Sequence, residues 1–269
     1  MSTPLVILCP GQGAQTVGMG KAFAEKSPDA KTVFDRADEI LGDSLGVPLS
    51  RLCFEGPADR LNKTDASQPA IFTTSMACYA TLKAQWNYGK GEAPIAAAAG
   101  LSLGEYTALT IAGTMSFEDG LKLVTLRGRA MQDAAEASEG GMVALIGADE
   151  SQAQQVCDKA RGSDVLVCAN FNAPGQIVLS GSKSACDRAG PIASELGLRA
   201  TALVVAGAFH SPLMKPAAER LAKALSDVEI RTPRCPVYAN VTAAPHSPTP
   251  QSIRERLVEQ LTSPVRWAQ

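Results

Sequence analysis

The sequence contains few charged residues, few aromatic residues and no long apolar run. Of its 269 residues, 19% are charged and 5% are aromatic, and the net charge is −2. Nucleic-acid binding through phosphates normally needs a basic surplus, so we expect no nucleic-acid partner. The apolar runs Leu5–Cys9 and Pro94–Ala99 are too short for a signal peptide or a membrane span, so we expect no membrane partner.

Histidine is scarce, and cysteine lacks a pattern. The two histidines are His210 and His246, and the cysteines are odd in number and never spaced as C-x-x-C. Several of them lie in apolar runs, which is typical of small core residues in a reducing compartment. We therefore expect a cytoplasmic protein with no metal site. The cysteines are Cys9, Cys53, Cys78, Cys157, Cys168, Cys186 and Cys235.

Strand and helix patterns alternate along the chain, which favours an α/β fold with a parallel sheet core. Leu5–Cys9 and Ile95–Gly100 are predicted to be buried strands. Apolar periodicity predicts helices over 18–42, Gln68–Trp86 and Glu105–Ala112.

The stretch 138–205 has its own pattern, βαββαβ, which is that of a ferredoxin-like unit. We therefore expect a hydrolase-like large domain, 1–137 and 206–269, with a small ferredoxin-like insert at 138–205. Within the large domain, the proline-rich segment Ala243–Pro250 is predicted to be a surface loop. The elements expected in the insert are strand Gly141–Gly147, helix Asp149–Ala160, strand Val165–Asn170, strand Gln176–Ser180, helix Lys183–Leu196 and strand Arg199–Val205.

Gly100-Leu-Ser-Leu-Gly104 matches G-x-S-x-G between a predicted strand and a predicted helix. In that context a sharp turn presents the serine hydroxyl, and flanking glycines allow the tight backbone. A plain glycine turn with a serine helix cap fits the same residues. A serine nucleophile usually needs an imidazole base. His210 follows an apolar run that resembles a strand exit, where catalytic groups gather, although a capping or core histidine fits as well.

Six blocks, in order, carry a resemblance to a known family. Together they resemble the malonyl-CoA:acyl carrier protein transacylases of fatty-acid synthesis, which are related to polyketide synthase acyltransferase domains. The resemblance covers essentially the whole chain. The blocks are Gly11-Gln-Gly-Ala-Gln15, Gly100-Leu-Ser-Leu-Gly-Glu-Tyr106, Leu126-Arg-Gly-Arg-Ala-Met-Gln132, Asn170-Phe-Asn-Ala-Pro-Gly-Gln176, Gly207-Ala-Phe-His-Ser-Pro-Leu-Met214 and Pro264-Val-Arg-Trp267.

The resemblance implies a serine–histidine site without a triad acid. Ser102 would form the acyl-enzyme, and His210 would be its base. A backbone carbonyl near the last block, which falls at Arg266, would orient the imidazole. The backbone N–H groups of Gln12 and Leu103 would form the oxyanion hole, although a simple glycine turn also explains the first block.

Substrate contacts follow from the same resemblance. Arg127 would pair with the malonyl carboxylate, for which a planar guanidinium is suited; a solvated helix arginine is the better description of Arg129. Phe209 would favour malonyl over methylmalonyl by steric exclusion. Further contacts with substrate or coenzyme A would come from Gln68, Met131, Asn170, Gln176 and Arg199, although turn and strand-end roles explain the last three almost as well.

The implied activity is ping-pong transfer of malonyl from malonyl-CoA to the phosphopantetheine thiol of acyl carrier protein. No permanently bound cofactor is implied, and we expect a monomer. The sequence departs from the family pattern at two points. Leu101 stands where most members have histidine, and the given sequence ends at Gln269, whereas members usually continue for a few dozen residues beyond the position of Trp267. A serine thioesterase or esterase would share Ser102 and His210 but expects an acid between them. A catalytically silent scaffold that binds carrier protein is a further alternative.

Overall fold

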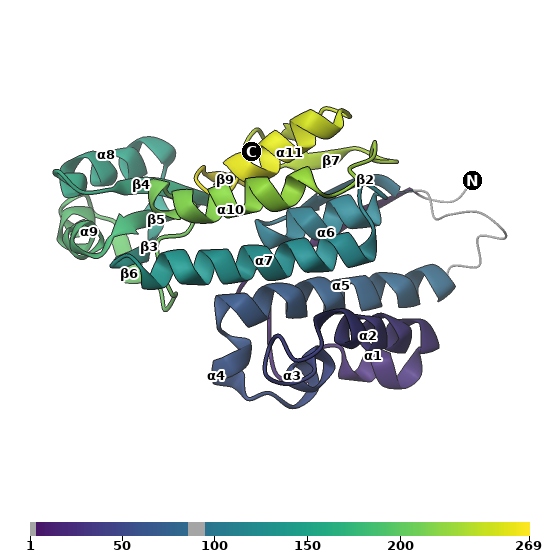
Figure 1. Ribbon diagram of the computed structural model, residues 1–269. Coiled ribbons are helices and arrows are strands. Elements are labelled where there is room, and N and C mark those ends of the chain that lie inside the picture. Colours follow the sequence, from purple (N-terminus) through teal and green to yellow (C-terminus); the bar gives the residue numbers. More distant parts are fainter. Residues whose placement is uncertain (1–3, 86–94) are drawn as a thin grey trace. The chain divides into compact units, whose positions relative to one another are not determined.

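The computed structural model describes residues 4–85 and 95–269, and the chain forms two compact units (Figure 1). The first unit comprises Met1–Arg129, Asp227–Ala239 and Pro245–Ile253. The second comprises Ala130–Ser226, Asn240–Ala244 and Arg254–Gln269, and so contains all of the 138–205 stretch.

A parallel sheet is the centre of the first unit. Strand β1 (Leu5–Cys9) pairs in parallel with β2 (Ile95–Gly100), and β2 pairs in parallel with β7 (Val237–Ala239). The short β8 (Ala244–Pro245) follows β7 in the sheet order. The two strands predicted from apolar runs both form, but the expectation that they are buried is wrong for β1: Val6 (61%) and Leu8 (64%) are exposed, because they lie on a strand face that the described residues leave largely uncovered. The carboxyl ends of β1 and β2 lie together because Cys9 is paired with Gly100.

Helices pack around this sheet. Helix α6 (Leu103–Ile111) packs against β1, β2 and β7, and α5 (Thr64–Gln85) packs against α6. Short helices precede α5: α1 (Lys21–Lys26), α2 (Pro28–Leu41), α3 (Leu49–Glu55) and α4 (Ala58–Leu61). Helices α7 (Phe117–Glu136) and α11 (Pro250–Glu259) each contain residues of both units.

The three helices predicted by periodicity need correction, and the one expected over Glu105–Ala112 begins at Leu103 and ends at Ile111. The helix expected over 18–42 is two helices, because Ser27 accepts a hydrogen bond from the amide of Ala30 (3.3 Å) and Pro28 begins α2. The helix expected from Gln68 begins at Thr64, so Pro69 lies inside it rather than near its start. Its predicted end, Trp86, lies outside the described residues.

The second unit contains the expected ferredoxin-like arrangement. Its strands lie in the order β6-β3-β5-β4-β9, with antiparallel pairs among the first four and β9 (Val265–Arg266) parallel to β4. The element order βαββαβ is confirmed, with β6 ending earlier than predicted. The elements are β3 (Gly140–Ala148), α8 (Glu150–Arg161), β4 (Leu166–Ala173), β5 (Gly175–Ser182), α9 (Lys183–Glu195) and β6 (Arg199–Ala202).

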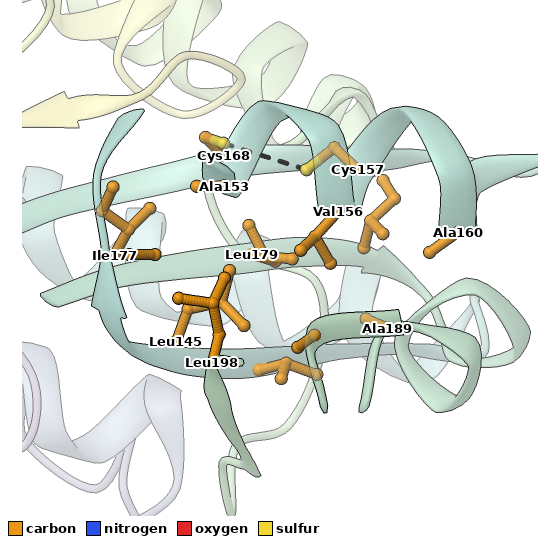
Figure 2. Close-up of a cluster of buried hydrophobic side chains, with 14 of the residues drawn as sticks. Leu145, Ala153, Val156, Cys157, Ala160, Cys168, Ile177, Leu179, Ala189 and Leu198 are labelled. Atoms are coloured by element: carbon orange, nitrogen blue, oxygen red, sulfur yellow. Dashed lines mark hydrogen bonds between the residues drawn. The ribbon is translucent and has the colours of Figure 1, made fainter. Parts of the chain in front are cut away.

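The core of this arrangement is apolar and regular. Leu145 and Leu179 from the sheet lie against Val156 of α8 and Ala189 of α9, and all four are fully buried (Figure 2). Helix α8 begins with a capping box: the side chain of Asp149 accepts a hydrogen bond from the backbone N–H of Gln152, and the side chain of Gln152 accepts one from the backbone N–H of Asp149. The rest of the second unit adds η1 (Pro212–Met214) and α10 (Lys215–Ser226).

The cysteines are free thiols, as the sequence indicates. The Sγ atoms of Cys157 and Cys168 lie 3.8 Å apart in the apolar core (Figure 2). Over residues 4–85 and 95–269, no three or more His, Cys, Asp or Glu side chains gather as a metal site would require. None of the described helices combines the length and hydropathy needed to cross a membrane.

Candidate active site

A strained turn joins β2 to α6 and carries Ser102. The residue has φ 51° and ψ −103°, in a region that non-glycine residues rarely adopt. Such a conformation costs about 1–3 kcal/mol and persists only where the surrounding structure holds it. Ser102 lies at the N-cap of α6 without capping the helix through its side chain, so the hydroxyl is left for another task.

Three glycines make this turn possible. A Cβ on Gly100 would overlap the backbone of Gly104, and a Cβ on Gly104 would overlap the carbonyl of Cys9 at the end of β1. On the other side, a Cβ on Gly11 would overlap the carbonyl of Leu101. The end of β1, the serine turn and the first turn of α6 therefore pack backbone against backbone, which is the geometry expected of G-x-S-x-G in a nucleophile turn.

Arg127 lies directly at the serine. Its Nη2 donates to Ser102 Oγ (2.9 Å), and its Nη1 donates to Gln68 Oε1 (2.7 Å). The residue is only 1% exposed, and its guanidinium carbon lies 5.3 Å from the centre of the Tyr106 ring. Burial lowers the pKa of the Arg127 guanidinium, while Tyr106 and Glu105 oppose that shift. Ser102, Gln68 and Arg127, which were all predicted from the sequence to be site residues, thus form one buried cluster.

The close approach of two helices explains why Gln68 reaches Arg127. Gln68 lies in the second turn of α5, and Arg127 lies within α7. Next to Arg127, a Cβ on Gly128 would come 2.7 Å from the carbonyl oxygen of Thr64, at the start of α5. Glycine at 128 therefore lets α7 pass close enough for the two side chains to bond. Gln68 itself is fully buried.

The two amides predicted for an oxyanion hole lie beside this cluster in the first unit. Leu103 is the first residue of α6, a position where helix geometry provides no acceptor for the N–H group. Gln12 lies in the turn after β1, and its side chain donates to Thr64 Oγ1 (3.3 Å). Both amides belong to segments that the three glycines bring together.

His210 lies in the second unit and is held by a carbonyl, but not by that of Arg266. Its Nδ1 lies 2.8 Å from the carbonyl oxygen of Gln260, so the prediction of Arg266 is corrected. Gln260 follows the last residue of α11, where helix carbonyls have no helical N–H partner and can accept from a side chain. Arg266 instead lies in β9, where its amide donates to the Asn240 carbonyl and its guanidinium lies over Phe171.

This hydrogen bond fixes the imidazole tautomer. A carbonyl can only accept, so Nδ1 must carry the proton and Nε2 keeps its lone pair in the neutral ring. His210 is also buried and has a positive φ of 56°. The histidine is thus prepared to accept a proton at Nε2.

Other predicted contact residues lie in the second unit. Gln176 and Arg199 are both paired with Ile146, one on each side of β3, so they share one face of the sheet. Asn170 is paired with Val178 and lies on that same face, because Val178 follows Gln176 by two residues. This face is opposite the one that packs on α8 and α9. Met131 and Phe209 are buried.

Sequence reasoning missed one buried pair. His246 was expected on a surface loop, but its side chain is fully buried and its Nε2 lies 2.8 Å from Glu105 Oε1. The proline-rich composition suggested a solvated loop, whereas a fully buried acid on α6 supplies a partner for the imidazole. Tyr106 was also missed, although it lies in the block that contains Ser102.

Comparisons with known proteins identify the family of this chain. The acyl transferase domain family matches residues 6–269. The malonyl CoA-acyl carrier protein transacylase of Bacillus subtilis (strain 168) is 44% identical over 265 residues, which are 98% of this chain and 80% of that protein.

Solved structures give the same result. The malonyl CoA-acyl carrier protein transacylase of Coxiella burnetii superimposes with a TM-score of 0.91 at 37% identity, over 98% of this chain and 81% of that one. A malonyl-transacylase in complex with a type II polyketide synthase acyl-carrier protein superimposes with a TM-score of 0.89 at 38% identity, over 98% and 83% of the two chains. The chain belongs to the acyl transferase family and, within it, to the malonyl-CoA:acyl carrier protein transacylases.

Proposed function

We propose that this protein transfers malonyl from malonyl-CoA to the phosphopantetheine thiol of an acyl carrier protein through an ester on Ser102. The observation that carries the proposal is the buried Arg127, which donates to the Ser102 hydroxyl (2.9 Å). A cation placed at a nucleophile suits an acyl group that ends in a carboxylate. The relatives named for this activity support the same reaction.

In the first half-reaction, His210 takes the Ser102 proton at Nε2 while the serine oxygen attacks the thioester carbon. The C–S bond then breaks, and the proton passes to the coenzyme A thiolate. In the second half-reaction, the carrier thiol gives its proton to His210 and attacks the ester carbon. The C–O bond to Ser102 then breaks, and His210 returns the proton to the serine oxygen, which leaves malonyl on the carrier and regenerates the free serine. Gln260 keeps the imidazole in the required tautomer by accepting from Nδ1.

Arg127 selects the acyl group. Its two hydrogen-bond acceptors described above, Gln68 and Ser102, are neutral. The buried Glu105 already favours the charged guanidinium. A malonyl carboxylate adds a charged acceptor for its N–H groups at the nucleophile, whereas an acetyl group adds none. The expected result is a preference for the diacid thioester.

The oxyanion that forms on attack needs preorganised donors. We assign the backbone N–H groups of Leu103 and Gln12 to this role. One such donor typically lowers the barrier by about 2.7–4 kcal/mol.

The remaining contacts belong to coenzyme A and to the acyl pocket. Asn170, Gln176 and Arg199 share one sheet face, so a single ligand could meet all three. Met131 and the ring of Phe209 would line the acyl pocket, where Phe209 would disfavour an added methyl group by about 1–3 kcal/mol.

We expect the active form to be a cytoplasmic monomer with no permanently bound cofactor. Malonyl-CoA is its substrate, and the phosphopantetheine comes with the carrier protein. The division into a large domain, 1–137 and 206–269, and a subdomain, 138–205, remains a proposal about how the chain is organised. It is supported by the separate apolar core of β3–β6 with α8 and α9.

Intact mass spectrometry tests the function. The protein mixed with malonyl-CoA should gain one malonyl group, and holo-acyl carrier protein should then remove it and carry it. Ser102→Ala should gain nothing, whereas Ser44→Ala, at an exposed position of the same unit, should behave as the unmodified chain.

Three results would contradict the proposal. Free malonate with no malonyl-carrier product would indicate a thioesterase or esterase. Binding of carrier protein without turnover would indicate a scaffold. Transfer without a detectable ester on Ser102 would remove the covalent mechanism.

A further inference from the structure

A buried acid–imidazole pair lies next to the nucleophile turn, and the proposed reaction does not use it. Glu105 is in the first turn of α6, three residues after Ser102, and His246 directly follows β8. Both side chains are fully buried, and Glu105 Oε1 lies 2.8 Å from His246 Nε2. The His246 amide donates to the carbonyl of Val237 in β7 (2.8 Å), so the sheet holds the backbone of this histidine.

The pair depends on the imidazole as donor. A carboxylate only accepts, so Nε2 of His246 carries a proton. Among the described residues, Nδ1 of His246 has no hydrogen-bond partner. The imidazole therefore makes its side-chain hydrogen bond through Nε2, to Glu105. Without that donor, a carboxylate would lose a hydrogen bond in a site from which solvent is excluded, which is costly.

Glu105 is coupled to the serine through the backbone. Its amide donates to the Ser102 carbonyl (3.1 Å), and the Gly104 amide donates to the Leu101 carbonyl (2.9 Å). These bonds form the first turn of α6, which holds Ser102 at its positive φ and presents the Leu103 amide. A strained residue persists only when its neighbours are fixed. The glycines allow the close backbone contacts on one side of the turn, and the Glu105 amide closes the other by its hydrogen bond to the Ser102 carbonyl.

We propose that His246 is a positioning residue: by hydrogen-bonding Glu105, it holds the first turn of α6 so that the Ser102 hydroxyl and the Leu103 amide are aligned for acylation. This inference rests on the proposed function. Arg127 and Gln68 come from α7 and α5 rather than from this turn, and Glu105 keeps its carboxylate near Arg127 when His246 is replaced. We therefore expect recognition of the substrate carboxylate to change less than the acylation rate.

This role is tested by measuring the acylation rate and KM for malonyl-CoA separately, because a positioning residue should change the rate more than KM. His246→Leu removes the donor at similar volume, and we expect the acylation rate to fall about tenfold while KM for malonyl-CoA changes less than about twofold. His246→Gln keeps an N–H donor and should restore most of the rate. If His246→Leu does not fold, His246→Asn, whose side chain is too short to reach Glu105, should show the same loss.

A control separates positioning from stability. Phe34→Leu removes part of a buried ring in α2, where Phe34 packs on Phe54, and should lower the unfolding temperature without slowing acylation. Rates are measured by quenched-flow intact mass with malonyl-CoA, at a temperature where every variant is folded. The unmodified chain in the same assay tests the proposed function separately.

The outcomes are distinct. A slowed His246→Leu, rescued by Gln and not matched by Phe34→Leu, supports the inference. Unchanged acylation in His246→Leu, no rescue by Gln, or a loss confined to KM overturns it while leaving the proposed function intact. Absence of malonyl ester on the unmodified chain overturns both.

Discussion

The serine turn and the ferredoxin-like arrangement are built by different rules. At the turn, a non-glycine residue has positive φ, glycines meet backbone directly, and charged side chains such as Arg127 and Glu105 are fully buried. In the ferredoxin-like arrangement, apolar side chains fill the space between the sheet and α8 and α9, and α8 begins with a complete capping box, although Gly181 of β5 also meets the backbone of Val165. Local preferences and global fold agree over most of the second region, where Pro191 inside α9 is an exception, and conflict in the first, as is expected where function requires strain.

The comparison teaches where the chain tolerates change. Regular apolar packing adjusts to substitution at a graded cost, because side chains repack. A backbone-to-backbone contact has no side chain that can move. Substitutions at the turn should therefore act in an all-or-none manner, and those in the apolar core should act by degree.

Two glycine substitutions test that contrast most strongly. Gly100→Ala places a Cβ on the Gly104 backbone, so we expect loss of about 4 kcal/mol or more, or no soluble protein. Gly190→Ala in α9 meets no atom within 4 Å apart from its chain neighbours, and its helix-favouring effect is opposed by the following Pro191, so stability should change by less than about 1 kcal/mol. Urea unfolding measures both, and equal effects would remove the contrast.

A core substitution in the ferredoxin-like arrangement should separate stability from chemistry. Leu145 is fully buried among the apolar residues of Figure 2, so Leu145→Ala should cost about 2–5 kcal/mol. The rate of malonyl loading, measured well below the unfolding temperature, should not change. Leu203→Ala, at a position 37% exposed, should cost less than about 1 kcal/mol. A slower rate in folded Leu145→Ala would show that the two regions are coupled.

Alkaline pH should weaken the first unit through its buried thiols. Burial raises the pKa of Cys9 to about 12 and is the main cause that raises the pKa of Cys53 to about 12, from the ordinary thiol value of 9.0. Between pH 9 and pH 12 each of these thiols loses its proton in the unfolded chain and keeps it in the folded chain. Stability is therefore fully present below pH 9 and falls as pH rises toward 12.

The effect should be about 1 kcal/mol for each thiol at pH 10. Cys9→Ala should show a shallower decline than the unmodified chain when the free energy of unfolding at pH 8 is compared with that at pH 10. Parallel declines in the two proteins would mean that the Cys9 thiol ionises in the folded state as readily as in the unfolded one.

The sequence predicts the regular parts best. The strands ending at Cys9 and Gly100 and the βαββαβ order follow from periodicity, because each pattern matches the element that forms. Ser102 follows from its flanking glycines, whose spacing has a direct steric meaning. Its contact with Arg127 could be expected only from the family resemblance.

The errors have physical causes. Gln260 acts through its carbonyl, which every residue has, so no side-chain pattern marks the partner of His210. His246 lies in a proline-rich segment that suggests solvent, and only the fold shows the buried acid that meets it. The break at Ser27 was missed because apolar periodicity continues on both sides of the cap.

The central claim is that a buried cation at the nucleophile selects a diacid, and Arg127→Ala tests it most directly. Loading of the chain is followed by intact mass with malonyl-CoA and with acetyl-CoA. Arg129→Ala, two residues away with a side chain 60% exposed, is the matched control and should keep the original preference. We predict that Arg127→Ala loses malonyl loading by about 100-fold or more and gains acetyl loading relative to malonyl. Retained malonyl loading with no relative gain of acetyl would contradict the account.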